Sequence, residues 1–287
     1  MPVTDTPLRY PGGKTQLSPL VEEIIRTNGL EQGFYCEPFA GGAGIACRLL
    51  LNGTASEVWI NDVDPAVHAF WHSMVYAPEA LCDRVLNTPV TMQEWHRQRA
   101  VLHGGSEDIL ELGFAALFLN RTNRSGILKG GVIGGYDQRG KYPLDCRFHR
   151  PNLVRKIRRI ALYRDRIQLT RMDAREYIQK VVPRLPRRSL VNIDPPYFGK
   201  GEELYMSFYT AKDHAALAQA VRTLGKPWML TYDDAPEIRS LYLGQPGMRK
   251  ELNYTAQDKK VGVELLVLSP QLRCPPSLEL DLLPIAA

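Results

Sequence analysis

A carboxylate, two prolines and an aromatic ring stand together where an apolar stretch of the sequence ends. The residues are Asp194, Pro195, Pro196 and Tyr197, and the stretch Leu190–Asp194 predicts a strand. Open α/β sheets bind ligands at the carboxyl ends of their strands. Two prolines remove two backbone donors and leave carbonyl oxygens as acceptors. Acceptors beside an aromatic face suit a planar group with an NH₂, such as a nucleobase. The structural alternative is a stiff turn with a surface tyrosine.

A glycine-rich turn followed by a carboxylate forms a second group. The turn runs from Glu37 to Gly44 after the predicted strand Phe34–Glu37, and Asp62 ends the next predicted strand 18 residues later. Glycines let a ligand approach the backbone, and a strand-end carboxylate can accept hydrogen bonds from ribose hydroxyls. The pattern predicts an adenosine-containing cofactor without separating a dinucleotide from S-adenosylmethionine. A tight turn with Asp62 as a helix cap is the structural alternative.

A third motif lies near the N-terminus. It reads Leu-Arg-Tyr-Pro-Gly-Gly-Lys over residues 8–14. The motif resembles a phosphate loop, but the preceding strand and the full Walker spacing are missing. We therefore do not expect an ATPase.

The elements that position these motifs alternate between strand and helix. A strand is expected at Val58–Asp62 and a helix at Pro65–Met74, which predicts a parallel sheet. Residues 76–168 interrupt this series with helical pieces and a glycine-rich stretch at 126–140. The series then resumes, and further elements are expected at Lys212–Leu224, Trp228–Tyr232, Pro236–Leu241, Met248–Tyr254 and Val261–Leu268. The last two could form a closing hairpin.

Composition and charge narrow the class of protein. Of 287 residues, 44% are hydrophobic and 23% charged, as in globular proteins. The sequence shows no membrane-length apolar run, no secretory signal and no C-x-x-C pair among five cysteines, so we expect reduced thiols and no metal site. Residues 121–188 hold 19 lysines and arginines against five acidic residues, and the rest of the chain holds 17 against 26. This asymmetry favours a face that binds a polyanion.

The three motifs in this order resemble the Dam-type adenine-specific (N6) DNA methyltransferase family. That family shows L-[RK]-[YW]-x-G-G-K, then E-P-F-x-G-x-G, a strand-end acid, a DNA-recognition insertion and D-P-P-Y. Residues 118–121, Phe-Leu-Asn-Arg, followed by Gly126, are similar to the start of its recognition hairpin. The resemblance covers about residues 7–270.

The resemblance implies an α/β fold, a Rossmann-like S-adenosylmethionine-dependent methyltransferase sheet with an inserted, mainly helical DNA-recognition domain. The catalytic domain would comprise residues 1–75 and 165–275, the insertion 76–164 and a tail 276–287. The implied activity is methyl transfer from S-adenosylmethionine to the N6 amine of a flipped adenine in double-stranded DNA. A prokaryotic or phage-type cytoplasmic setting, with or without a cognate restriction nuclease, is expected, with no membrane and no obligate protein partner.

Residue roles also follow from the resemblance. The catalytic residues would be Asp194, Pro195, Pro196 and Tyr197. The cofactor-binding residues would be Tyr10, Lys14, Glu37, Phe39, Gly41, Gly42, Gly44, Asp62, Asp173 and Asp194. The DNA-binding residues would be Arg9, Asn120, Arg121, Asn123, Arg124, Lys129, Arg139 and Lys141. The charge excess of residues 121–188, independently of the resemblance, predicts that Lys156, Arg158 and Arg159 lie on the DNA backbone.

The recognition segment departs from the best-studied members. Residues 122–126, Thr-Asn-Arg-Ser-Gly, stand where those members have an aromatic residue and an asparagine, so the sequence GATC is not implied as the target. Alternatives on the residues alone are methylation of cytosine N4 in DNA or of adenine in RNA. An inactive nucleic-acid-binding methyltransferase fold and a nicotinamide-dependent reductase are the alternatives from other classes.

Overall fold

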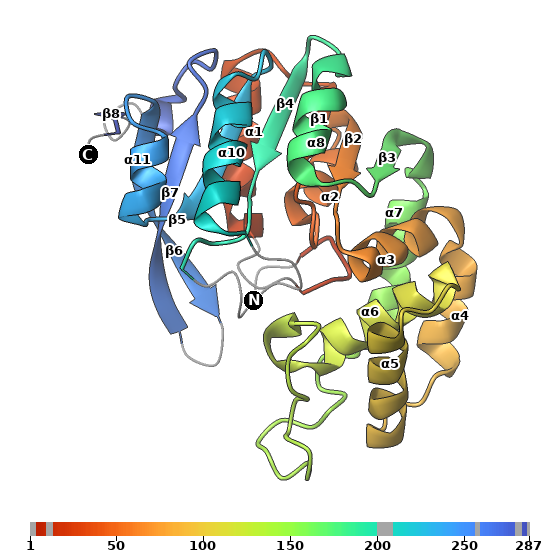
Figure 1. The fold of residues 1–287 in the computed structure, drawn as a ribbon. Helices are drawn as coiled ribbons and strands as arrows, with labels where there is room; N and C mark the ends of the chain where they lie inside the picture. The colour runs from red at the N-terminus through yellow and green to blue at the C-terminus, as the bar shows by residue number, and fades with distance from the viewer. Residues whose placement is uncertain (1–3, 10–13, 200–208, 256–258, 279–282, 286–287) are drawn as a thin grey trace.

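The centre of the molecule is one eight-stranded sheet with the order β3-β2-β1-β4-β5-β7-β6-β8 (Figure 1). The computed structural model describes residues 4–9, 14–199, 209–255, 259–278 and 283–285. The strands are β1 (Gly33–Glu37), β2 (Ala55–Asn61), β3 (Ile167–Thr170), β4 (Ser189–Ile193), β5 (Trp228–Asp233), β6 (Pro246–Thr255), β7 (Lys259–Leu268) and β8 (Leu283–Pro284). The first five strands in this order are parallel, and β7 is antiparallel to both β5 and β6.

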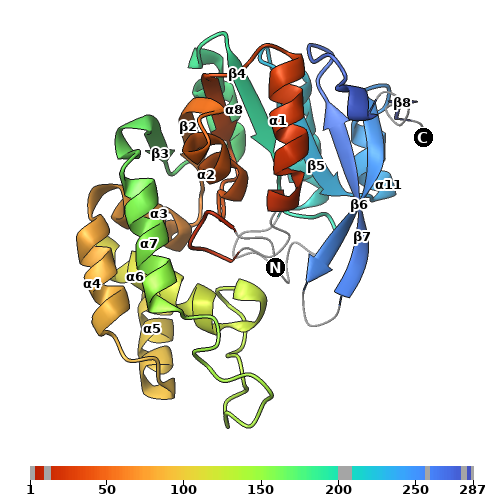
Figure 2. The ribbon, with the colours of Figure 1, turned by 180° about the vertical axis from the view of Figure 1, so that it is seen from behind.

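Helices cover both faces of the sheet, as the two opposite views show (Figures 1 and 2). On one face lie α8 (Ala174–Lys180), α10 (Ala211–Arg222) and α11 (Pro236–Leu241). On the other lie α1 (Ser18–Thr27) and α2 (Gly44–Leu51). Each face has its own buried apolar cluster. The central strands β1, β4 and β5 are buried on both sides, which is why their sequences are mostly apolar, whereas β2 and the edge strand β3 are partly exposed.

Five helices follow β2 before the chain returns to the sheet at β3. They are α3 (Pro65–Tyr76), α4 (Pro78–Asn87), α5 (Met92–Gly104), α6 (Ile109–Thr122) and α7 (Arg150–Ala161). Asp64, Thr91 and Asp108 cap the first turns of α3, α5 and α6 with their side chains. Gly113 lets α6 approach α3 closely, because a Cβ there would lie 2.5 Å from the carbonyl oxygen of Ala69. One apolar cluster runs through these helices into the α1 and α2 face of the sheet, so they share its core.

The observed elements follow the predicted series closely. The closing hairpin is present as β6 and β7. The glycine-rich stretch after α6 is mostly turns, with one isolated antiparallel bridge between Asn123 and Val132. The expected tail contributes to the fold: Leu278 is buried and β8 pairs with β6. Short 3-10 helices are η1 (Lys14–Leu17), η2 (Arg124–Gly126), η3 (Arg164–Arg166), η4 (Val182–Arg184) and η5 (Pro276–Leu278).

A membrane-spanning helix is absent from the part of the chain that the structure describes, since none is both long and apolar enough.

Candidate active site

A buried cluster joins the N-terminal motif to the Asp-Pro-Pro-Tyr motif. Lys14 Nζ lies 3.2 Å from Asp194 Oδ1 and 3.2 Å from Glu264 Oε2. It also donates a hydrogen bond of 2.8 Å to the Tyr197 hydroxyl, which in turn donates one of 2.8 Å to Glu264 Oε1. The same ammonium lies 4.8 Å from the centre of the Tyr197 ring. Two carboxylates and a phenol therefore share one ammonium.

Strand direction explains how these groups meet. Glu264 lies in β7, and because β7 runs antiparallel it pairs with Asp233, which ends β5. Both residues thus reach the carboxyl edge of the parallel strands. Thr231 Oγ1 donates to Asp194 Oδ1 at 2.9 Å. Asp233 accepts hydrogen bonds from the backbone N–H groups of residues 198 and 199, each of 2.9 Å. The neighbouring strands therefore fix both ends of the Asp-Pro-Pro-Tyr turn.

The glycine-rich turn is held by the carboxylate that the sequence singled out. Asp62 accepts from the backbone of Gly41 at 2.8 Å through Oδ2 and from that of Asp64 at 3.0 Å through Oδ1. Burial, the largest cause, raises the pKa of Asp62 to about 7. Trp71 Nε1 donates to the carbonyl of Gly41 at 2.8 Å. Ala43 begins α2 in the left-handed conformation, with φ of 41°.

Two predicted cofactor residues, Glu37 and Gly44, stand at the two ends of this turn. Glu37 is buried and accepts a hydrogen bond from Tyr35 at 3.0 Å. Burial raises the pKa of Glu37 to about 8, and the nearby Asp194 charge adds to the shift. Gly44 is required by packing, because a Cβ there would lie 2.3 Å from Thr15 Oγ1 beside the N-terminal motif. These contacts fix both ends of the turn, and Gly42 is buried within it.

Asn61 and Tyr209 are two further residues at this edge that the sequence did not single out. Asn61 is fully buried, donates to the carbonyls of Pro38 and Met172, and accepts from Thr170 Oγ1. It thereby ties together the ends of three strands. Tyr209 packs edge-on against Phe39 at 5.9 Å.

Two more cofactor predictions remain. Asp173 is exposed and caps α8 through a bond from the Glu176 backbone. Tyr10 lies outside the described residues.

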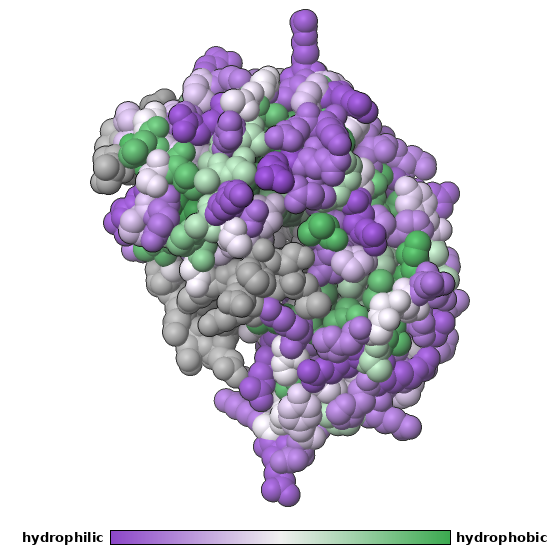
Figure 3. All heavy atoms as spheres, in the orientation of Figure 1, coloured by the Kyte–Doolittle hydropathy of each residue, from purple (hydrophilic) through white to green (hydrophobic). Residues whose placement is uncertain are grey.

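The predicted DNA-binding residues separate into two groups. Arg124, Lys129, Arg139 and Lys141 are exposed on the loop between α6 and α7. Hydrophilic side chains cover this lower end of the molecule (Figures 1 and 3).

Asn120 and Asn123 are buried, in contrast to this exposed group. Asn120 accepts from the Arg9 backbone N–H and donates to the carbonyls of Arg9 and Gly126. Asn123 donates to two carbonyls of the loop and accepts from Trp95 Nε1 at 2.7 Å. These two amides hold the loop backbone in place.

Three arginines gather where the N-terminal motif meets the loop. Arg121 donates to the carbonyls of Arg147 and Pro7. Burial and then the charges of Arg9 and Arg147 lower the pKa of Arg121 to about 10. Burial and the Arg147 charge also lower the pKa of Arg9, whose Nη1 is buried without a hydrogen-bond partner among the described residues. Such mutual repulsion would be relieved by a bound anion.

The basic residues of α7 are engaged within the protein instead. Lys156 donates to Thr4 Oγ1 and the Thr6 carbonyl. Arg158 pairs with Glu79 at 2.6 Å and Arg159 with Asp5 at 3.2 Å. The expectation that these three cations face DNA stays a prediction, since the side chains of Arg158 and Arg159 are still 54% and 52% exposed in these pairs.

Comparison with known proteins places these motifs in one family. The model of the D12 class N6 adenine-specific DNA methyltransferases matches residues 10–256. The chain belongs to this family. The match confirms the Dam-type resemblance and makes this chain an S-adenosylmethionine-dependent, N6-adenine-specific DNA methyltransferase by family.

Solved structures match this chain only at low identity and with low TM-scores. The rRNA methyltransferase AviRa from Streptomyces viridochromogenes is 16% identical, with a TM-score of 0.38 over 91% of this chain and 86% of that one. TrmN from Thermus thermophilus is 12% identical, with a TM-score of 0.39 over 89% of this chain and 48% of that one. No curated protein sequence gives a significant match.

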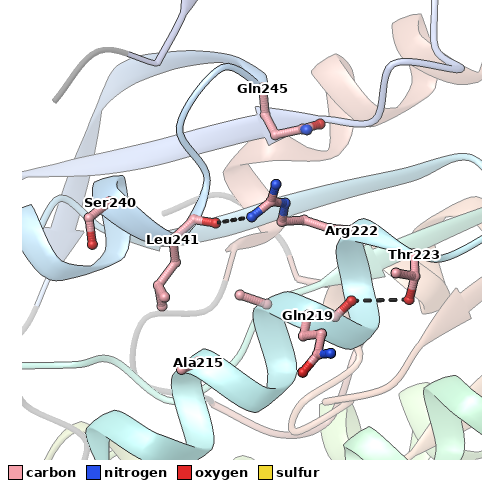
Figure 4. A pocket seen from close by; sticks show the side chains of 8 residues that line it. Ala215, Gln219, Arg222, Thr223, Ser240, Leu241 and Gln245 are labelled. Atoms are coloured by element: carbon pink, nitrogen blue, oxygen red, sulfur yellow. Dashed lines mark hydrogen bonds between the residues drawn. The ribbon is translucent and has the colours of Figure 1, made fainter.

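A surface pocket of this methyltransferase lies away from the motifs. It has a volume of about 400 Å³ and sits between α10 and α11, lined by Gln219, Arg222, Leu241 and Gln245 among others (Figure 4). Arg222 donates to the Leu241 carbonyl across it at 3.5 Å. None of the motif residues lines it. Within the described part of the chain, three or more histidine, cysteine or acidic side chains nowhere gather in a metal-binding arrangement.

Proposed function

We propose that this D12 methyltransferase transfers a methyl group from S-adenosylmethionine to the N6 amine of an adenine flipped out of duplex DNA. The observation that carries the proposal is the placement of Asp194. Its Oδ1 is held by Thr231 and Lys14 at the end of β4, and the same Lys14 ammonium lies 4.8 Å from the centre of the Tyr197 ring. A carboxylate fixed next to an aromatic face suits an aromatic amine.

The chemistry required of these residues is limited. The lone pair of the adenine amine is delocalised into the ring, so the amine is a poor nucleophile. S-adenosylmethionine, when bound, supplies a methyl group on a sulfonium. Asp194 and the Pro195 carbonyl would accept hydrogen bonds from the amine and favour a tetrahedral nitrogen whose lone pair points at the methyl. The N–C bond forms as the S–C bond breaks, and one amine proton leaves to solvent.

The hydrogen bonds of Asp194 assign separate tasks to its two oxygens. Thr231 and Lys14 both hold Oδ1. We therefore assign Oδ2 to the amine of the base. Positioning of this kind and fixed electrostatics supply most of the rate enhancement that such a transfer needs.

The residues present fit the cofactor. Each carboxylate oxygen of Asp62 accepts one hydrogen bond from the backbone, so its remaining lone pairs can accept hydrogen bonds from ribose hydroxyls. Phe39 and the turn at 41–44 lie at the same strand ends and would hold the adenosine. Lys14 and Asp194 border the site beside them. Asp173, at the exposed start of α8, would contribute from the rim.

DNA would bind across the N-terminal motif and the α6–α7 loop. Arg124, Lys129, Arg139 and Lys141 are exposed there and would contact phosphates or bases. We assign the group of Arg9, Arg121 and Arg147 to a backbone phosphate, because burial and mutual repulsion lower the pKa of Arg9 and of Arg121, and a bound anion would relieve both effects. Asn120 and Asn123 would act by positioning the loop.

Single-turnover methylation tests the proposal. Duplex DNA and labelled S-adenosylmethionine are incubated with wild-type enzyme or Asp194→Asn, and the nucleosides are separated by chromatography. We expect N6-methyladenine from wild type and a loss of about 3 kcal/mol, roughly a hundredfold in rate, for the variant. Asp165→Asn is the matched control, since that carboxylate is 94% exposed on η3.

The product also discriminates between the alternatives. Label in 4-methylcytosine would contradict adenine as the substrate, and a rate higher on RNA than on duplex DNA would contradict the substrate class. A near-normal rate for Asp194→Asn would contradict the role of this residue.

A further inference from the structure

Glu264 is out of place in its own strand. It interrupts the apolar run 263–268 of β7, and its four following neighbours, 265–268, are buried. The residue itself is only 2% exposed. A carboxylate buried in this way is costly unless its charge and its lone pairs are satisfied. A strand built for packing alone would place an apolar side chain here.

The two oxygens of Glu264 serve two different functional groups. Oε1 accepts a hydrogen bond of 2.8 Å from the Tyr197 hydroxyl, and Oε2 lies 3.2 Å from Lys14 Nζ. The Tyr197 hydroxyl also accepts from Lys14 at 2.8 Å. The phenol is therefore held from both sides, which fixes the direction of the ring. Glu264 reaches Asp194 only through Lys14, since that ammonium touches both carboxylates.

We infer that Glu264 is a positioning residue for methyl transfer. This inference rests on the proposed function and extends it. Glu264 aligns the Tyr197 ring on which the flipped base stacks, and Glu264 also holds Lys14 against Asp194. The carboxylate acts through these two side chains, without touching the base. Removing it would leave binding of DNA and cofactor largely intact and would slow the chemical step, because a ring or carboxylate misplaced by about 1 Å costs much of the rate.

A double-mutant cycle separates this role from a contribution to folding alone. Single-turnover rates are measured for wild type, Glu264→Gln, Glu264→Ala, Tyr197→Phe and the double variant Glu264→Ala with Tyr197→Phe. Glu251→Gln is the control, because Glu251 is exposed on the neighbouring strand β6. Thermal unfolding and calorimetric binding of S-adenosylmethionine are measured for each variant.

We expect Glu264→Ala to lower the rate roughly ten- to a hundredfold, as the loss of a charge-assisted hydrogen bond does. Glu264→Gln keeps an acceptor for the phenol, so it should recover part of this loss. The double variant should be no more than about twofold slower than the slower single variant, because both changes break the same interaction. Cofactor affinity should stay within about threefold of wild type.

If the rate loss of the double variant equals the product of the two single rate losses, the inference is overturned. It is also overturned if Glu264→Gln has the same rate as the Glu251→Gln control. If Glu264→Ala does not fold, Glu264→Gln replaces it in the same cycle. The measured rate is that of methylation of whichever base the wild-type enzyme modifies. A base other than adenine would therefore overturn the proposed function, while the double-mutant cycle would still test the role of Glu264.

Discussion

Replacing Glu37 by glutamine should change the pH dependence of stability. Glu37 is buried at the end of β1, and burial raises its pKa from an ordinary 4.5 to about 8. The folded protein therefore keeps a proton on this carboxyl at neutral pH, while the unfolded chain releases it. Glutamine resembles the protonated form and retains an oxygen for the Tyr35 hydroxyl, which bonds Glu37 at 3.0 Å.

The sign and size follow from proton linkage. Between pH 4.5 and 8 the folded state binds one more proton than the unfolded state, so the free energy of unfolding of wild type falls as pH rises. The loss is about 1.4 kcal/mol per pH unit, or about 5 kcal/mol across the window. Glu37→Gln carries no such proton. Its stability relative to wild type should therefore rise by several kcal/mol between pH 5 and pH 8.

Urea unfolding followed by circular dichroism at pH 5, 6, 7 and 8 measures this difference. Other titrating groups cancel, because they are present in both proteins. Glu237→Gln, which removes an exposed carboxylate from the first turn of α11, controls for the loss of an acid as such. A difference between Glu37→Gln and wild type that does not change with pH would refute the reasoning.

Two further predictions concern ligands. The pKa of Asp62 is raised to about 7, and ribose hydroxyls bind its ionised form, so the affinity for S-adenosylmethionine, measured by calorimetry, should rise about tenfold from pH 6 to pH 8. Asp62→Asn should remove this rise. An equally steep rise in the variant would show that another group causes it. Replacing Arg124, Lys129 and Lys141 by alanine should lower the salt slope of duplex binding by about 0.9 for each phosphate that is no longer neutralised, measured by fluorescence anisotropy. Arg158→Ala should leave that slope unchanged, because Arg158 pairs with Glu79; a flatter slope would place α7 on the DNA.

The motifs at the strand ends could be predicted because each depends on local sequence. Asp62 and Asp194 each directly follow a strand, and the carboxyl ends of parallel strands share one edge of a sheet. The alternation of elements likewise predicted the sheet and its closing hairpin. The bridge from Lys14 to Asp194 was not predicted, since 180 residues separate them and only the fold brings them together.

Glu264 could not be assigned a role from sequence for a related reason. Its strand reads as an apolar run, and its place at the site depends on β7 running antiparallel to β5. A lone acid inside a buried strand was the available signal. Charge counting located the basic segment, but it could not show the acidic partners, such as Glu79 and Asp5, that pair with cations of α7. Burial of Asn120 depends equally on tertiary packing.

The charge of the cluster bears on why this site favours methylation of an amine. One ammonium, Lys14, contacts two carboxylates, so the group carries an excess negative charge close to Tyr197. During the transfer the amine nitrogen gains positive charge before its proton leaves. Fixed negative charge beside that nitrogen stabilises the transition state more than the neutral amine, and a dry site strengthens the effect. Because Glu264 shares the Lys14 ammonium, Lys14 offsets the charge of Asp194 less than it would if it contacted Asp194 alone.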